Sequence, residues 1–131
     1  MVHAAHAQAP GGAPSLSALV RATKAAVIAH DTSAMRRLVY WEGSDSTKRT
    51  ETIRFLSYAS TPVQRVETRP VPATTLVHFQ FHGVPYETTL PPLGEVHVIF
   101  RTVKGSGGSM GVMYGIKDGR YYLVTSRPVA P

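Results

Sequence analysis

The sequence predicts a single α+β domain, in which three N-terminal helices pack on one face of a curved antiparallel β-sheet. Apolar residues of the first half recur at the three- and four-residue spacing of helices, whereas those after Pro62 recur at every second residue, as in strands. The length of 131 residues, with 43% hydrophobic and 17% charged residues, fits one globular domain with its own core. Helices followed by a run of strands are typical of the α+β class.

Each of the three helices begins at a residue type that caps helices. The first should start after Ser15 and run to about His30, with an apolar stripe made of Leu16, Leu19, Val20, Thr23, Ala26 and Val27. The second is short, begins at Asp31 or Thr32, and should end at Trp41-Glu42-Gly43. The third begins at Asp45 or Ser46 and continues to about Tyr58, because Pro62 disfavours helical angles in the residue before it.

The second half is expected to form strands separated by glycine and proline. The expected strands cover 62–69, 76–82, 84–90, 95–103 and two segments that follow Gly108, centred on Met110–Ile116 and Tyr121–Thr125. Tight turns are predicted at His82-Gly83 and Asp118-Gly119, since glycine accommodates positive φ. The stretch from Lys104 to Gly108 is expected to be a flexible hairpin loop. It is not a phosphate-binding loop, because it lies between two strands and lacks the required Lys-Ser/Thr ending.

Residues 1–14 are rich in Ala, His, Pro and Gly and are predicted to be a disordered arm preceding the domain at 15–131. Two segments of the arm, Ala5-His6-Ala7 and Ala7-Gln8-Ala9, have the small-x-small form that precedes signal-peptidase cleavage. We therefore expect an exported protein, periplasmic or extracellular. The alternative is an Ala-rich tail on a cytoplasmic protein.

The charge pattern limits the classes of partner. The net charge is +6, from 14 Lys and Arg against 8 Asp and Glu, but the cations are scattered and the longest runs are pairs. Nucleic-acid binding normally requires several cations on one face, so we expect no nucleic-acid partner. No apolar window is long enough to span a bilayer. The absence of cysteine excludes thiol nucleophiles, zinc–thiolate sites and disulfides, and no cofactor is predicted.

Two local segments and the order of elements suggest a family. Residues 29–40 read AHDTSAMRRLVY and residues 117–122 read KDGRYY. The first resembles the junction between the first two helices of the nuclear transport factor 2-like superfamily, and the second resembles its late hairpin. The resemblance covers roughly residues 15–127. It implies a sheet that curls around the helices into a cone with an apolar pocket, and its catalytic members place an acid where Glu42 lies here.

The residue types that could line such a pocket are mostly aromatic, as is usual for a small-molecule site. The pocket candidates are Tyr40, Trp41, Tyr58, Phe79, Tyr86 and Tyr114. A tyrosine or histidine beside Glu42 could form an acid–base pair with it. The simpler interpretation is that these aromatic residues belong to the core.

Three histidines offer a possible metal site. His78 and His82 lie four residues apart on one expected strand, and His97 lies on a nearby strand. Three imidazoles on one face of a sheet could hold zinc if the strand register agrees. The alternative is a polar, solvent-facing side of the sheet.

Three functional hypotheses follow. The first is a non-catalytic exported domain that binds a small apolar ligand or a protein partner. The second is a small lyase, isomerase or hydrolase that uses Glu42 with a neighbouring His or Tyr. The third is a homo-oligomeric interaction module, such as a homodimer that pairs through a sheet face or edge.

Overall fold

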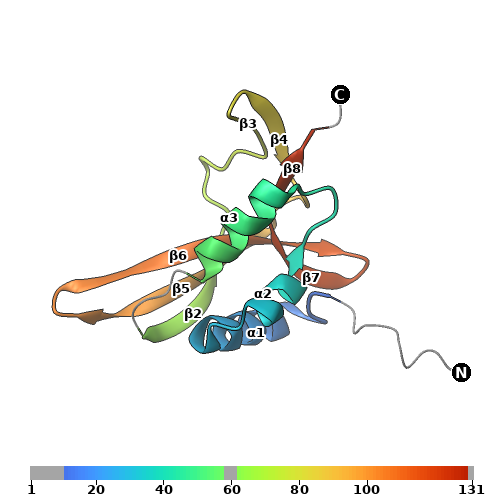
Figure 1. The fold of residues 1–131 in the computed structure, drawn as a ribbon. Helices are drawn as coiled ribbons and strands as arrows, with labels where there is room; N and C mark the ends of the chain where they lie inside the picture. Colours follow the sequence, from blue (N-terminus) through green and yellow to red (C-terminus); the bar gives the residue numbers. More distant parts are fainter. Residues whose placement is uncertain (1–10, 58–61, 130–131) are drawn as a thin grey trace, which may run out of the picture.

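The computed structural model describes residues 11–57 and 62–129, and this part of the chain confirms the α+β class (Figure 1). Its helices are α1 (Leu16–Ala29), α2 (Thr32–Leu38) and α3 (Ser46–Leu56). Its strands are β1 (Val39–Tyr40), β2 (Val63–Arg69), β3 (His78–Phe81), β4 (Val84–Thr88), β5 (Gly94–Val103), β6 (Ser106–Lys117), β7 (Arg120–Val124) and β8 (Ser126–Pro128). In the described ranges, no helix has the length and apolar character needed to cross a bilayer.

The three predicted helix starts are confirmed. The side chains of Ser15, Asp31 and Asp45 each accept a hydrogen bond from the backbone N–H three residues later, at 3.1, 3.0 and 2.8 Å. These bonds satisfy N–H groups that have no partner inside the helix. Helix α1 ends at Ala29 because His30 adopts a left-handed conformation, with φ of 52°.

The second helix is shorter than predicted. It ends at Leu38, because Val39 is extended with φ −93° and ψ 141°. Val39 and Tyr40 instead form the short strand β1, which pairs in parallel with Leu123 and Val124 of β7. Gly43 has φ of 80° and belongs to the turn after this strand rather than to a helix end.

The strands of the described ranges form two sheets rather than the single predicted sheet. The large sheet has the order β1-β7-β6-β5-β2, and the small sheet has the order β3-β4-β8. All pairs are antiparallel except β1 with β7. A single residue, Thr125, separates β7 of the large sheet from β8 of the small sheet. Its carbonyl accepts the backbone N–H of Thr89 at 2.9 Å, which links the end of β4 to the same point.

Within residues 62–129, three hairpins close through two-residue turns. At His82-Gly83, Lys104-Gly105 and Asp118-Gly119 both residues have positive φ, between 50° and 78°. This geometry matches the twist of the paired strands. The first and third turns were predicted. The second shortens the loop expected from Lys104 to Gly108, because Ser106 already begins β6.

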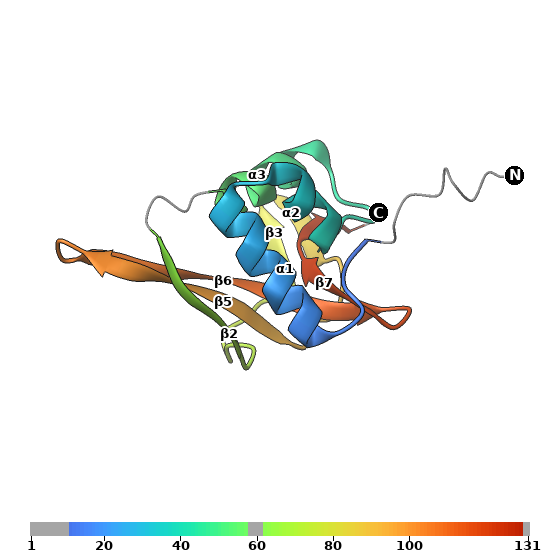
Figure 2. The ribbon, with the colours of Figure 1, turned by 90° about the horizontal axis from the view of Figure 1, so that it is seen from below.

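The core lies between α1 and the inner face of the large sheet. Figure 2 shows α1 lying across this sheet. Leu19 and Val27 of α1 and Val96 and Val98 of β5 are almost fully buried in one cluster. The β5–β6 hairpin extends beyond the helices in both views (Figures 1 and 2).

The disordered arm predicted for residues 1–14 does not extend as far as residue 14. Gly12 N donates to the Arg37 carbonyl at 2.7 Å, and Ala13 pairs with Tyr121 through two backbone hydrogen bonds of 2.8 Å. The guanidinium of Arg120 donates to the carbonyls of Gly11 and Gly12. Residues 11–13 therefore form an ordered part of the fold, while residues 1–10 lie outside the described ranges.

Candidate functional site

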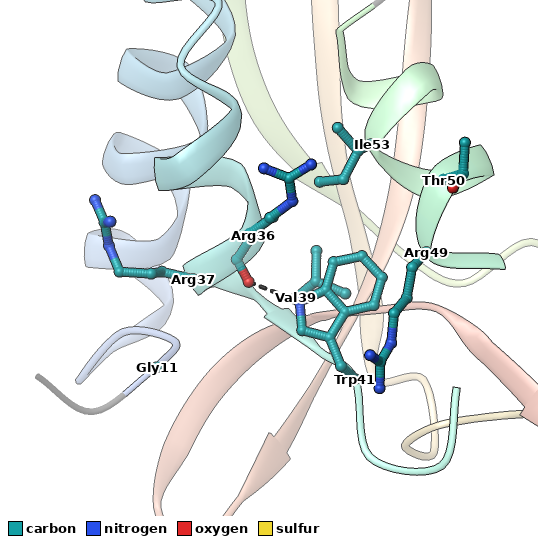
Figure 3. A pocket seen from close by; sticks show the side chains of 8 residues that line it. All are labelled: Gly11, Arg36, Arg37, Val39, Trp41, Arg49, Thr50 and Ile53. Atoms are coloured by element: carbon teal, nitrogen blue, oxygen red, sulfur yellow. Dashed lines mark hydrogen bonds between the residues drawn. The ribbon is translucent and has the colours of Figure 1, made fainter. Parts of the chain in front are cut away.

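A cavity of about 1020 Å³ lies between α2, β1 and α3 (Figure 3). We call it the Trp41 cavity. It is lined by Gly11, Arg36, Arg37, Val39, Trp41, Arg49, Thr50 and Ile53. Its volume slightly exceeds the range of about 300 to 1,000 Å³ that is typical of small-molecule sites.

The end of α2 positions two of the lining residues. Arg36 and Arg37 occupy the last turn, where cations interact favourably with the helix dipole. The Trp41 indole N–H donates to the Arg36 carbonyl at 2.8 Å. This carbonyl belongs to the last turn, whose carbonyls have no partner inside the helix. The hydrogen bond therefore fixes the indole against the end of α2.

Helix α3 supplies the opposite wall. Ile53 and the β1 residue Val39 are buried and form an aliphatic surface within the cavity. In Figure 3, Arg36 extends from α2 toward Ile53, and Arg49 extends from α3 past the indole of Trp41. Arg37 points away, toward α1 (Figure 3).

The arginines of the cavity carry positive charge without compensation. Among the described residues, the guanidinium groups of Arg36, Arg37 and Arg49 form no ion pair. A guanidinium group remains charged at any physiological pH and binds carboxylate, sulfate or phosphate through paired hydrogen bonds. The cavity thus combines an anion-binding edge with an indole and an aliphatic surface.

Of the predicted aromatic pocket residues that the structure describes, only Trp41 lines this cavity. Tyr40 packs edge-on against Tyr122, with ring centroids 5.2 Å apart. Tyr114 of β6 packs over Gly94, where a Cβ atom would lie 2.6 Å from its ring. Tyr58 lies outside the described residues.

Phe79 and Tyr86 belong to the small sheet, where they and Phe81 surround Lys48, a residue that no sequence motif marks as part of a site. The Lys48 ammonium lies 3.7 Å from the centroid of the Phe81 ring, 5.6 Å from that of Phe79 and 5.4 Å from that of Tyr86. Glu51 pairs with the same ammonium at 3.0 Å. Lys48 is 7% exposed, so this contact attaches the β3–β4 hairpin to α3 rather than offering a free site. Two sequence features could have indicated this contact. Phe79 and Phe81 alternate on one strand, and Lys48 and Glu51 have the three-residue spacing of an ion pair on a helix.

Glu42 is exposed and does not line the Trp41 cavity. Its carboxylate accepts a hydrogen bond from the Tyr40 hydroxyl, so the predicted neighbouring tyrosine is present. This hydrogen bond, together with a smaller contribution from desolvation, raises the pKa of Tyr40 to about 12. The pair therefore holds its proton on the phenol at neutral pH, with the carboxylate as acceptor.

The three predicted metal-binding histidines are not brought together. His97 lies on β5 of the large sheet, whereas His78 lies on β3 of the small sheet. His82 has φ of 51° and belongs to the turn after β3, so it does not continue the face of that strand. Within residues 11–57 and 62–129, no three His, Cys, Asp or Glu side chains form a group that could hold a metal ion.

No protein-family model, curated protein or solved structure matches this chain.

Proposed function

We propose that this domain binds a small anionic molecule with an apolar part in the Trp41 cavity, and that it does so without transforming it. The observation that carries this proposal is the presence of two guanidinium groups, those of Arg36 and Arg49, without ion-pair partners among the described residues and next to an indole and a buried aliphatic surface. The sequence led us to expect an apolar ligand. The arginines make an amphipathic anion the better fit.

Each part of such a ligand has a counterpart in the cavity. The anionic group would pair with Arg36, which extends from α2 toward Ile53, or with Arg49, which extends from α3 past the Trp41 indole (Figure 3). The apolar part would contact the Trp41 indole, Val39 and Ile53. Hydrogen bonds to charged groups contribute about 1.5 to 3 kcal/mol each, so the anionic group would dominate selectivity over a neutral analogue.

We propose further that the chain is a member of the nuclear transport factor 2-like superfamily with a cone-shaped sheet, and that it is exported. Support for the family comes from the order of elements and the segments AHDTSAMRRLVY and KDGRYY. Support for export comes from the two small-x-small segments before Pro10.

An enzymatic function at Glu42 is the second candidate, favoured by the hydrogen bond from Tyr40. It requires Glu42 to act as acid or base on a substrate that reaches the turn after β1. Glu42→Gln separates the two candidates, because it should abolish turnover in an enzyme and leave binding in the Trp41 cavity unchanged.

The cavity contains its own reporter, because Trp41 is the only tryptophan of the chain. We would titrate the protein with octanoate and with octanol at constant ionic strength and follow the intrinsic fluorescence. Octanoate should shift the emission of Trp41 at saturable concentrations, whereas octanol should bind at least tenfold more weakly, reflecting the lost pairing with arginine. Equal affinities for the two would contradict the proposal.

Two substitutions on one helix provide the matched control. Arg49 and Arg54 both lie on α3, and replacing either one by alanine changes the net charge by the same amount. Of the two, only Arg49 lines the cavity. We expect Arg49→Ala to weaken octanoate binding about tenfold or more and Arg54→Ala to leave it nearly unchanged. An equal loss in both variants would indicate general electrostatic attraction rather than a site.

A further inference from the structure

A serine, a histidine and a glutamate form a hydrogen-bonded chain on the large sheet. The Ser109 Oγ lies 2.9 Å from Nε2 of His97, and Nδ1 of His97 lies 2.7 Å from Oε1 of Glu95. The His97 and Glu95 side chains are 14% and 16% exposed, while Ser109 is exposed. The His97 and Glu95 side chains are therefore largely shielded from solvent, whereas the Ser109 hydroxyl is open to it.

Strand geometry places all three side chains on one face. Glu95 and His97 are two residues apart on β5, and the alternate residues Val96 and Val98 are buried on the other face, in the core. Ser109 reaches His97 diagonally from β6, where Gly111 is the direct partner of His97. The cluster therefore lies on the side of the large sheet away from the core.

The absence of a side chain at Gly111 leaves room for the Glu95 carboxylate. A Cβ atom at Gly111 would lie 2.5 Å from the carboxyl carbon of Glu95 and 2.6 Å from its Oε1. The Glu95 carboxylate thus lies over the backbone of β6, in the space that a side chain at 111 would fill. This location puts it against Nδ1 of His97.

The order of the three groups defines their proton positions. A carboxylate can only accept hydrogen bonds, so in the neutral imidazole Nδ1 carries the proton and donates it to Glu95. Nε2 then accepts the Ser109 hydroxyl proton. A nucleophile bonded to a base, which is in turn oriented by a third group, is the arrangement that activates serine in acyl transfer.

We propose that Ser109 is a nucleophile toward esters, with His97 as its general base and Glu95 as a positioning residue. Ser109 Oγ bonds to the ester carbonyl carbon while its proton passes to His97 Nε2. The tetrahedral intermediate then expels the alcohol, which takes that proton. Water attacks the acyl-serine in the same way, releasing the carboxylic acid and restoring Ser109.

The open edge of β6 supplies hydrogen-bond donors beside Ser109. In the described chain β7 pairs with β6 only from Tyr114 to Lys117, so the edge of β6 beside Ser109 has no strand partner. Alternate N–H groups along such an edge point outward and are the donors available to an oxyanion. This activity goes beyond the proposed ligand binding, since it uses a different face and none of the residues of the Trp41 cavity.

The test is covalent labelling with a fluorophosphonate, which forms a stable bond with an activated serine, followed by peptide mass spectrometry. The label should be found on Ser109 and should be absent from Ser109→Ala. The labelling rate should fall about a hundredfold or more in His97→Ala. The exposed serine of α2 provides the control, because Ser33→Ala should label at the rate of the unmodified protein.

Turnover of 4-nitrophenyl acetate tests the positioning role. Gly111→Ala displaces only the flexible end of Glu95, so the circular dichroism spectrum should be unchanged. In this variant and in Glu95→Gln, kcat should fall at least tenfold while KM stays constant, whereas a purely structural contact would leave both constants unchanged. Labelling of a residue other than Ser109, no labelling at all, or undiminished turnover in Ser109→Ala would overturn the proposal.

Discussion

The Tyr86 hydroxyl donates a hydrogen bond of 2.5 Å to Oδ2 of Asp45, while Oδ1 of the same carboxylate accepts the Lys48 backbone N–H at 2.8 Å. One side chain thus caps α3 and also anchors β4 of the small sheet. The cap is local in sequence, whereas the anchor joins residues 41 positions apart.

Comparison of two helix caps measures the value of this double role. Asp31 and Asp45 both cap a helix, but among the described residues only Asp45 also accepts a tyrosine hydroxyl. Asp31→Ala should lower the free energy of unfolding by about 1 kcal/mol, the usual value of a cap. Asp45→Ala should lower it by clearly more, measured by urea denaturation. Equal losses would mean that the Tyr86 contact contributes nothing.

The Asp45 carboxylate makes the free energy of unfolding depend on pH in the acidic range. The hydrogen bonds from Tyr86 and then from the Lys48 backbone lower the pKa of Asp45. Its stabilising contribution is therefore complete above the pKa of about 3.9 expected in the unfolded chain, and it is lost as the pH falls through the lower folded pKa. The Arg65 and Arg69 side chains lower the pKa of Glu67 in the same direction. The difference between the unmodified protein and Tyr86→Phe isolates the effect of Asp45.

We expect Tyr86→Phe to lose less stability than the unmodified protein when the pH falls from about 5 to below the folded pKa of Asp45. The measurement is the urea midpoint at a series of pH values, with Tyr114→Phe as a control for loss of a phenol. Parallel curves for all three proteins would show that the pKa of Asp45 does not depend on Tyr86.

The Tyr40 phenol should lose its proton at a higher pH than an ordinary tyrosine. Its hydrogen bond to Glu42 raises the pKa of the phenol to about 12, so its phenolate absorbance should appear well above pH 10. The hydrogen bond to Asp45 also raises the pKa of Tyr86, so the contribution of Tyr40 has to be identified by substitution. Because the folded pKa is raised, the associated stability is complete below pH 10 and is lost as the pH rises through about 12. Glu42→Gln should move this titration toward pH 10, and Tyr40→Phe should remove it. A high-pH absorbance change that is undiminished in Tyr40→Phe would contradict this assignment.

The N-terminal segment can be tested with two glycines. Gly12 and Gly119 have φ of 71° and 78°, but only at Gly12 would a Cβ atom clash, 2.6 Å from the Tyr121 carbonyl. Gly119→Ala should cost about 1 to 2 kcal/mol for the left-handed conformation alone. Gly12→Ala should cost more and should increase hydrogen exchange at the Ala13 and Tyr121 amides. Unchanged exchange would mean that the segment adapts without releasing its pairing.

The predictions that succeeded depend on local chemistry. Ser15, Asp31 and Asp45 cap their helices because a side-chain oxygen needs only its own next turn. The Asp118-Gly119 turn likewise follows from the positive φ that glycine permits. Such features require no knowledge of the rest of the chain.

The features that the sequence did not predict depend on distant partners. The two residues of β1 are a strand only because Leu123 and Val124 lie beside them. Arg36 and Arg49 look like scattered surface cations until α2 and α3 place them around Trp41. Ser109 adjoins what looked like a glycine-rich loop, and its contact with His97 depends on the register of β5 with β6.

The insertion of β7 between β1 and β6 has a consequence for how the chain folds. The helical half is synthesised first, but strand β1 and residues 11–13 find their partner only when β7 has been made. Contacts of such long sequence separation slow folding, because a large loop must close before they form. A nascent chain that lacks β7 would expose the edges of β1 and β6 and leave a gap in the core where Leu123 packs. Folding on the ribosome should therefore be completed only after residue 124 has emerged from the exit tunnel.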